Sequence, residues 1–314
     1  MSSARPPFFS KPSSSFMLHE KAPSAEADVE RGVAQKRTAT RRFHDLLMEL
    51  GAEFVGTAIL CAFGCGGNCQ YVVGSPTFDT YATVPIGWAC GIALGAGFAG
   101  NRSGGHINPA VTAMLALVGK FPLWKFPLYG LAQLAGGFLG AAISYGVYYN
   151  DINKLDPGKT VALTAGLFGT YPELDAPGFS CWLAEFFPAC MLLGVVLYLV
   201  SLPSKPHFGL VPVVLFLTLL GVGCTYGSTT SFSINPARDL GPRLLTAAAG
   251  YGSEVWTYKD EYWLWGGQMG AFSASVFIAG VWWVHRAVEK YLLHAECDED
   301  EDLPTPPVEQ EESA

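Results

Sequence analysis

Two asparagines, Asn108 and Asn235, each stand before Pro-Ala at the start of a short apolar stretch. Asparagine caps helix N-termini through its side-chain oxygen, and proline fits the first helical turn because its missing N–H would have no partner there. Each copy therefore predicts a polar loop, a cap and then a helix too short to cross a membrane. Two such half-spanning helices place their positive dipole ends at mid-membrane, where they oppose cations and protons and leave amide donors for polar solutes.

Two glutamates lie inside apolar runs, and the same three residue types, Ala-Glu-Phe, surround Glu53 and Glu185. An ionisable side chain in a membrane span is costly and usually faces a cavity or a polar partner. Loop backbone at membrane depth also needs hydrogen-bond partners. We therefore expect the two carboxylates to support the two Asn-Pro-Ala loops. A proton relay is the alternative, although no chain of further acids or histidines accompanies these residues.

Arg238 directly follows the second Asn-Pro-Ala copy. A lone arginine deep in an apolar segment is expensive unless it is solvated or paired, so we expect it to line a passage. The loop before each asparagine should be extended and turn carbonyl groups into the same passage as acceptors. The backbone groups predicted to line it belong to Gly104, Gly105, His106, Ser231 and Ser233.

Composition indicates a membrane protein and argues against other classes. Of 314 residues, 50% are hydrophobic and 15% are charged, and 36 are glycine, which suits closely packed membrane helices. The net charge of -8 argues against a nucleic-acid partner, so none is predicted. The eight cysteines show no metal spacing with histidine and are interpreted as small hydrophobes. Without a hydrolase, metalloprotease or cofactor motif, we predict no enzyme, no metal and no cofactor.

Six apolar runs are long enough to span a membrane. The two half-helices lie between the second and third runs and between the fifth and sixth. Three spans plus one half-helix thus occur twice, which inverts the two halves in the membrane. The predicted fold is an all-α membrane protein with six transmembrane helices and two half-spanning re-entrant helices in an inverted repeat. The six runs are Leu46–Gly67, Ala82–Gly100, Leu123–Tyr148, Cys181–Leu202, Phe208–Gly227 and Trp263–His285.

The domain organisation follows from these runs. Residues 1–42 are rich in Ser, Pro and charge and are predicted to form a disordered cytoplasmic tail. Residues 43–290 form the predicted channel domain, with repeat one at about 43–150 and repeat two at about 180–290. Residues 291–314 form an acidic cytoplasmic tail.

The positions of Lys and Arg set the predicted orientation. Arg41 and Arg42 flank the first run, Lys205 follows the fourth, and Arg286 and Lys290 follow the sixth, whereas the loop after the first run has none. Because cytoplasmic loops carry the excess of positive charge, both termini should be cytoplasmic. The plasma membrane is preferred to an internal membrane.

With both Asn-Pro-Ala loops in place, the chain from residue 43 to 286 resembles a major intrinsic protein, the aquaporin and aquaglyceroporin family. The resemblance implies the aquaporin fold, a homotetramer in a lipid bilayer and no cofactor. It places Asn108 and Asn235 at the central constriction of a pore. It also implies that Glu53 and Glu185 hydrogen-bond the backbone of the two loops.

The family's outer constriction maps onto four positions by their distances from the two asparagines. Trp88 lies twenty positions before Asn108, and Phe232 and Gly223 lie three and twelve before Asn235, while Arg238 follows the motif. Trp, Gly, Phe and Arg together resemble the glycerol branch, whereas the water-selective branch usually has His in place of this glycine. The two rings would face the carbon side of a polyol. The alternative is that the rings face lipid.

Further features bear on which branch of the family the chain resembles, the glycerol branch or the water-selective one. Asp239 and Arg243 stand four apart and can form an ion pair, and the segment 164–172 resembles the glycerol branch's external loop. The segment 263–268 departs from that branch, which tends to have Pro followed by an aliphatic residue. The leading prediction is a passive channel for glycerol, other small neutral solutes and water that excludes ions and protons. The alternatives are a water-selective aquaporin or a structural membrane-junction protein with a closed pore.

Overall fold

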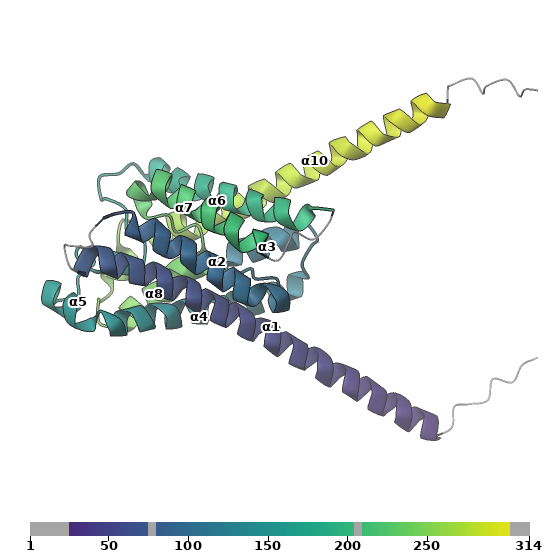
Figure 1. Cartoon of the computed structure of the whole chain (residues 1–314), viewed down its shortest axis with the longest axis horizontal. Coiled ribbons are helices and arrows are strands. Elements are labelled where there is room, and N and C mark those ends of the chain that lie inside the picture. Colours follow the sequence, from purple (N-terminus) through teal and green to yellow (C-terminus); the bar gives the residue numbers. More distant parts are fainter. Residues whose placement is uncertain (1–24, 75–79, 204–208, 302–314) are drawn as a thin grey trace, which may run out of the picture. The chain divides into compact units, whose positions relative to one another are not determined.

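The computed structural model describes residues 25–74, 80–203 and 209–301, and within this part every regular element is helical (Figure 1). The chain divides into two compact units, Met1–Asp45 and Leu46–Ala314, and the second contains the candidate site. The ends of both predicted tails lie outside the described residues, as do Lys205 and Phe208.

Within the described ranges, six helices are long and apolar enough to cross a membrane, which confirms the predicted number of spans. Helix α1 begins at Ala25, inside the segment predicted as tail, and α10 continues to Glu301. A 3-10 turn, η2 (Leu123–Lys125), precedes α4, and a π-helical turn, η4 (Trp263–Gln268), precedes α10. The six helices are α1 (Ala25–Val73), α2 (Thr83–Ser103), α4 (Phe126–Val147), α6 (Gly178–Ser201), α7 (Leu210–Thr230) and α10 (Met269–Glu301).

Two short helices occupy the predicted positions after the Asn-Pro-Ala motifs. Helix α3 spans Pro109–Leu117 and α8 spans Pro236–Ala248, and each has proline at its first position. The remaining short elements, α5 (Tyr149–Leu155), η3 (Ala165–Leu167) and α9 (Glu254–Thr257), lie in the two segments that connect α4 to α6 and α8 to η4. The chain therefore runs through two sets of two long helices, a half-helix and a third long helix.

The two sets interlock through their half-helices. Helix α3 of the first set packs against α10 of the second, and α8 of the second packs against α4 of the first. Helices α2 and α7 lie side by side (Figure 1). The two half-helices also contact each other. Each half-helix is thus enclosed mainly by the opposite set, as an inverted repeat requires.

Small residues let the backbones approach at these contacts. A Cβ atom on Gly137 of α4 would lie 2.5 Å from the Ala237 carbonyl oxygen of α8. At the corresponding contact between α10 and α3, the Ser275 hydroxyl donates a 2.8 Å hydrogen bond to the carbonyl oxygen of Ala110. Close backbone approach through small residues is a common mode of helix packing in membranes.

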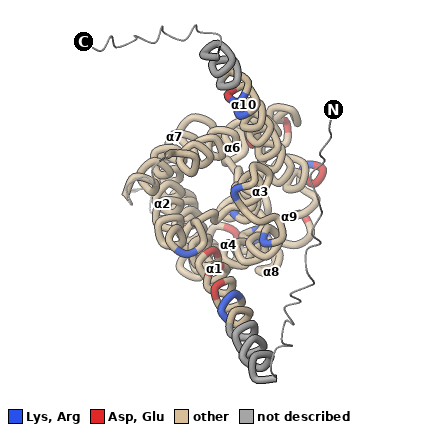
Figure 2. Tube along the Cα trace, turned by 90° about the vertical axis from the view of Figure 1, so that its right-hand side faces the viewer, with Lys and Arg blue, Asp and Glu red and all other residues tan. Residues whose placement is uncertain are grey.

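Charged residues are sparse along the traced helices (Figure 2). Most side chains of the long helices are apolar, and many large ones are exposed on the outside of the bundle. Six charged side chains of the described residues are nevertheless almost completely buried: Glu53, Asp156, Glu185, Arg238, Asp239 and Arg243. Asp156 accepts hydrogen bonds from Thr160 and Thr164 in the segment between α4 and α6. Because buried charge is costly without partners, the other five mark the candidate site.

Helix α4 offers a test of the close packing. A Cβ atom on Gly140 would overlap the Ala58 carbonyl oxygen of α1, whereas one on Gly146 would meet nothing within 4 Å. We expect Gly140→Ala to destabilise the protein by about 1–3 kcal/mol, since overpacking against backbone forces the helices apart. Gly146→Ala is the matched control and should not destabilise the protein, since its methyl group meets no neighbour and alanine favours helix over glycine. Thermal unfolding of the purified protein in detergent measures both, and equal melting temperatures would contradict this packing.

Candidate functional site

The carboxylate of Glu53 gathers the first loop from α1. Its Oε1 accepts hydrogen bonds from the His106 backbone N–H at 2.9 Å and the Ser103 hydroxyl at 2.5 Å. Its Oε2 accepts from the Ile107 N–H at 2.6 Å and the Gln133 side-chain amide at 2.7 Å. With four donors and no exposed surface, this side chain supports the loop that leads into α3.

Glu185 does the same for the second loop from α6. Its Oε1 accepts from the Ser233 N–H at 3.1 Å and the Tyr262 hydroxyl at 2.9 Å, and its Oε2 accepts from the Ile234 N–H at 2.9 Å. This role was predicted for both glutamates from the sequence, but the parts played by Gln133 and Tyr262 were not. A buried polar residue within or beside an apolar run is the signal that could have identified them.

The loop backbone is strained where the glutamates hold it. Ile107 and Ile234 both have φ of 41°, a left-handed conformation that is unfavourable for a β-branched residue. Such a residue costs on the order of 1–3 kcal/mol and persists only when its surroundings enforce it. The carboxylates accept hydrogen bonds from the N–H groups of these same two residues, so the backbone is held in place where it is strained.

The two asparagines are oriented by both loops. The Asn108 side-chain oxygen accepts from the Ala110 N–H at 2.8 Å, and the Asn235 oxygen accepts from the Ala237 and Arg238 N–H groups at 3.0 and 3.2 Å. Each asparagine therefore caps its own half-helix, as predicted.

The side-chain nitrogens of the asparagines cross to the opposite loop. Asn108 Nδ2 donates to the Ile234 carbonyl at 3.2 Å, and Asn235 Nδ2 donates to the Ile107 carbonyl at 2.9 Å. Each amide has two N–H groups. Among the described residues the second N–H of each amide has no protein partner and is available to a solute.

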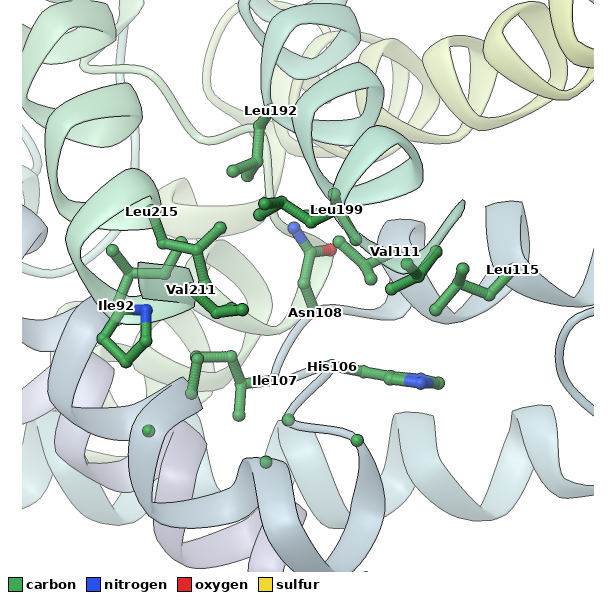
Figure 3. A pocket seen from close by; sticks show the side chains of 18 of the residues that line it. Ile92, His106, Ile107, Asn108, Val111, Leu115, Leu192, Leu199, Val211 and Leu215 are labelled. Atoms are coloured by element: carbon green, nitrogen blue, oxygen red, sulfur yellow. The ribbon is translucent and has the colours of Figure 1, made fainter. Parts of the chain in front are cut away.

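A cavity of about 700 Å³ opens on one side of the asparagine pair. Figure 3 shows aliphatic side chains of α2, α3, α6 and α7 around Asn108. Among the residues that line this cavity are five predicted from the sequence: Gly104, Gly105, His106, Asn108 and Asn235. Its wall is mostly apolar, with polar groups along the loop and Lys120 also lining it.

A second cavity of about 20 Å³ adjoins the first, and the two share three lining residues, Ile92, Leu192 and Asn235. This volume holds roughly one water molecule. It lies among residues predicted to form the outer constriction and the second loop, namely Trp88, Phe232, Ser233 and Arg238. The cavity on this side of the asparagines is thus far smaller than the cavity on the other side.

Arg238 is fixed at the narrow cavity. Its guanidinium donates to the carbonyl oxygens of Phe168 at 3.2 Å and Ser231 at 3.3 Å, and its central carbon lies 3.8 Å from the Trp88 ring centroid. Arg238 Nε and Ser233 Oγ are buried and have no hydrogen-bond partner in the described part of the chain. The residues that line the narrow cavity therefore include two with aromatic rings, Trp88 and Phe232, and two polar ones, Arg238 and Ser233.

Gly223 and Ser231 line neither cavity. A Cβ atom on Gly223 would lie 3.2 Å from Phe232 Cζ and 2.6 Å from Pro85 Cβ. The glycine therefore leaves the space into which the Phe232 ring packs. Ser231 has φ of 66° and contributes its carbonyl oxygen to Arg238.

The predicted ion pair between Asp239 and Arg243 forms and is buried, with 3.1 Å between Oδ1 and Nη2. Asp239 also accepts from the Thr170 N–H at 2.7 Å, and Arg243 donates to the Thr170 carbonyl at 2.7 Å. The Tyr171 ring stacks on Arg243, and burial raises the pKa of Tyr171 to about 12, so the phenol stays neutral. This cluster fastens the segment between α4 and α6 to α8.

Across the described residues, no group of three or more His, Cys, Asp and Glu side chains could hold a metal ion. The arrangement of the site is that of a narrow passage with fixed hydrogen-bonding groups, since its buried charges are all engaged with backbone or with each other.

Comparison with known proteins agrees with this arrangement. A family model described as Major intrinsic protein matches residues 41–277. Aquaporin-6 of Laccaria bicolor is 42% identical over 234 residues, covering 71% of this chain and 75% of that protein. The aquaglycerol porin AQY3 of Saccharomyces cerevisiae is 36% identical over 239 residues, covering 75% of this chain and 36% of that protein. The X-ray structure of the aquaglyceroporin from Plasmodium falciparum matches with a TM-score of 0.68 and 28% identity, covering 74% of this chain and 94% of that one.

The support of the second loop can be tested by substitution at Glu185. Glu185→Leu would leave the Ser233 N–H, the Ile234 N–H and the Tyr262 hydroxyl buried without an acceptor, at about 1–3 kcal/mol each. We expect a large loss of thermal stability and of folded protein, and a smaller loss for Glu185→Gln, which keeps one acceptor oxygen.

Glu173→Leu, at an exposed position, is the control. Melting temperatures in detergent compare the three variants with the parent protein. If Glu185→Leu melts with the parent, the carboxylate does not hold the loop.

Proposed function

The chain belongs to the major intrinsic protein family, whose members are membrane channels and not enzymes, and we propose that it passes glycerol and other small neutral solutes passively, together with water, while excluding ions and protons. One observation carries the proposal. The narrow cavity is lined by the aromatic residues Trp88 and Phe232 and by the polar residues Arg238 and Ser233. The aquaglycerol porin and aquaglyceroporin among its relatives support the same branch.

This wall matches the chemistry of a polyol. Glycerol has hydroxyl groups that need hydrogen-bond partners and a carbon backbone that does not. A hydroxyl group buried without a partner costs on the order of 1–3 kcal/mol, so a passage this narrow must supply donors and acceptors where it excludes water. Trp88 and Phe232 would face the carbons, and Arg238 would bind the hydroxyls, with Gly223 making room for the Phe232 ring.

Ion exclusion follows from the centre of the passage. The N-termini of α3 and α8 meet at Asn108 and Asn235, so the positive ends of two helix dipoles face the same point. Among the described residues, neither cavity has a carboxylate in its lining. A cation at the asparagine pair would therefore lose hydration and meet positive potential.

The remaining assignments extend the proposal. Glu53 and Glu185 support the loops, and the backbone of the residues before each asparagine supplies acceptors along the passage. The protein would assemble as a homotetramer in a lipid bilayer, with both termini in the cytoplasm and the plasma membrane as its location.

Transport should carry no ion current. We expect proteoliposomes containing the protein to shrink and reswell under a glycerol gradient without acidification of their interior under a pH gradient. The reason is the pair of asparagine donors at two helix N-termini, which interrupts any proton-conducting chain of water. A pH-sensitive dye inside the vesicles provides the measurement. Proton influx that scales with the amount of protein would refute ion exclusion, whatever the glycerol result.

The double substitution Gly223→His with Phe232→Cys tests the filter. Removing the ring clears the 3.2 Å contact at Gly223, and the imidazole then occupies the space beside the passage. We expect glycerol flux to fall roughly tenfold, equivalent to about 1.4 kcal/mol of added barrier, because the carbon side of the solute loses its apolar contact. Water flux should persist. Light scattering of proteoliposomes under sucrose and glycerol gradients measures both.

Gly223→Ala alone is the matched control, because its Cβ atom still displaces Pro85 while the Phe232 ring stays in place. An equal loss of glycerol flux in the control would mean that packing against Pro85, and not the filter, determines the effect. Unchanged glycerol flux in the histidine variant would exclude these two residues as the filter.

A further inference from the structure

The indole of Trp88 lies in a cradle formed by α1. A Cβ atom on Gly64 would overlap the indole carbons, so this helix position must lack a side chain for the ring to lie there. Trp88 is only 1% exposed, and its Nε1 donates a 3.2 Å hydrogen bond to the side-chain oxygen of Asn68, one helical turn after Gly64. The Arg238 guanidinium stacks on the ring. The ring is therefore fixed on its face and at its one polar atom.

The same asparagine also binds the segment between α4 and α6. Asn68 Nδ2 donates to the Leu167 carbonyl oxygen at 3.0 Å, and the next carbonyl along the chain, that of Phe168, accepts from Arg238 at 3.2 Å. Two successive carbonyl groups thus accept hydrogen bonds from two side chains that contact the Trp88 indole. The first carbonyl binds Asn68, and the second binds the Arg238 guanidinium. Asn68 is 7% exposed, so its amide would be costly to bury without these bonds.

We propose that Asn68 is a positioning residue for selectivity: by accepting the indole N–H of Trp88, it makes the ring present only carbon to the passage and keeps it in register with Arg238. Without this acceptor nothing holds the N–H away from the passage, so the ring no longer has to present only carbon to the solute. The consequence for glycerol rests on the function proposed above, whereas the hydrogen bond itself does not.

The test combines Asn68→Leu with Trp88→Phe, alone and together. Phenylalanine keeps a ring but has no N–H, so Asn68 should no longer matter for selectivity when residue 88 is changed in this way. We expect Asn68→Leu to lower the ratio of glycerol to water permeability by about threefold or more in the parent protein and to leave it unchanged in the Trp88→Phe protein. An equal decrease in both backgrounds would overturn the proposal, because Asn68 would then act only by joining α1 to the segment that contains Leu167.

Gln70→Leu is the matched control on the same helix. Its side-chain oxygen accepts a 3.0 Å hydrogen bond from the Tyr148 hydroxyl, so the substitution removes one bond between α1 and another element without touching Trp88. It should leave the permeability ratio at the parent value in both backgrounds. A change in the ratio as large as that of Asn68→Leu would contradict a specific role for Asn68.

A spectroscopic measurement tests the role of Asn68 separately from the proposed passage of glycerol. The ultraviolet resonance Raman difference between the parent and Trp88→Phe proteins isolates the Trp88 indole, whose bands respond to hydrogen bonding at the N–H group. We expect a hydrogen-bonded indole in the parent and a free one in Asn68→Leu, and identical spectra would overturn the role of Asn68. A parent protein that passes water but no glycerol would instead refute the proposed solute while leaving this result intact.

Discussion

Two buried carboxylates accept hydrogen bonds from the non-helical backbone of two loops inside this membrane protein. The rest of the site depends on these hydrogen bonds. Glu53 and Glu185 each bond two consecutive N–H groups of a loop, and the second of each pair belongs to an isoleucine in a left-handed conformation. In the lipid core, no water is available to hydrogen-bond an unpaired backbone group. The glutamates therefore determine where each loop ends, where each asparagine stands and where the helix dipoles point.

The two halves use the same plan with different side chains. Gln133 assists the first glutamate and Tyr262 assists the second, so an amide in one half corresponds to a phenol in the other. The asparagine amides then join the halves, since each donates to the loop of the opposite repeat. The narrowing is not symmetric, because Trp88, Phe232 and Arg238 gather on one side only, and the wide apolar cavity lies on the other.

The sequence predicted the features that have local periods or motifs. Apolar runs marked the six spans, and Asn108 and Asn235 marked the half-helices, since capping depends on neighbouring residues. It did not identify Asn68, Gln133 or Tyr262, because each acts on a residue 20 to 99 positions away and no periodicity reports such a contact. The place of Gly223 behind the Phe232 ring likewise depends on how α7 packs on α2, which spacing along the chain does not specify.

The exchange of half-helices between the repeats also sets an order of events during synthesis. Helix α3 ends at Leu117, but α10, against which it packs, begins only at Met269. The first re-entrant loop must therefore wait for most of the remaining chain to be translated and inserted before its half-helix finds its enclosing surface. Domains that fold as units during translation do so from contacts close in sequence, whereas contacts of long sequence separation form late and slowly. The first half of this channel is therefore incomplete when it is synthesised. Its half-helix is enclosed only in a final step, when the last helix, α10, is inserted and packs against it.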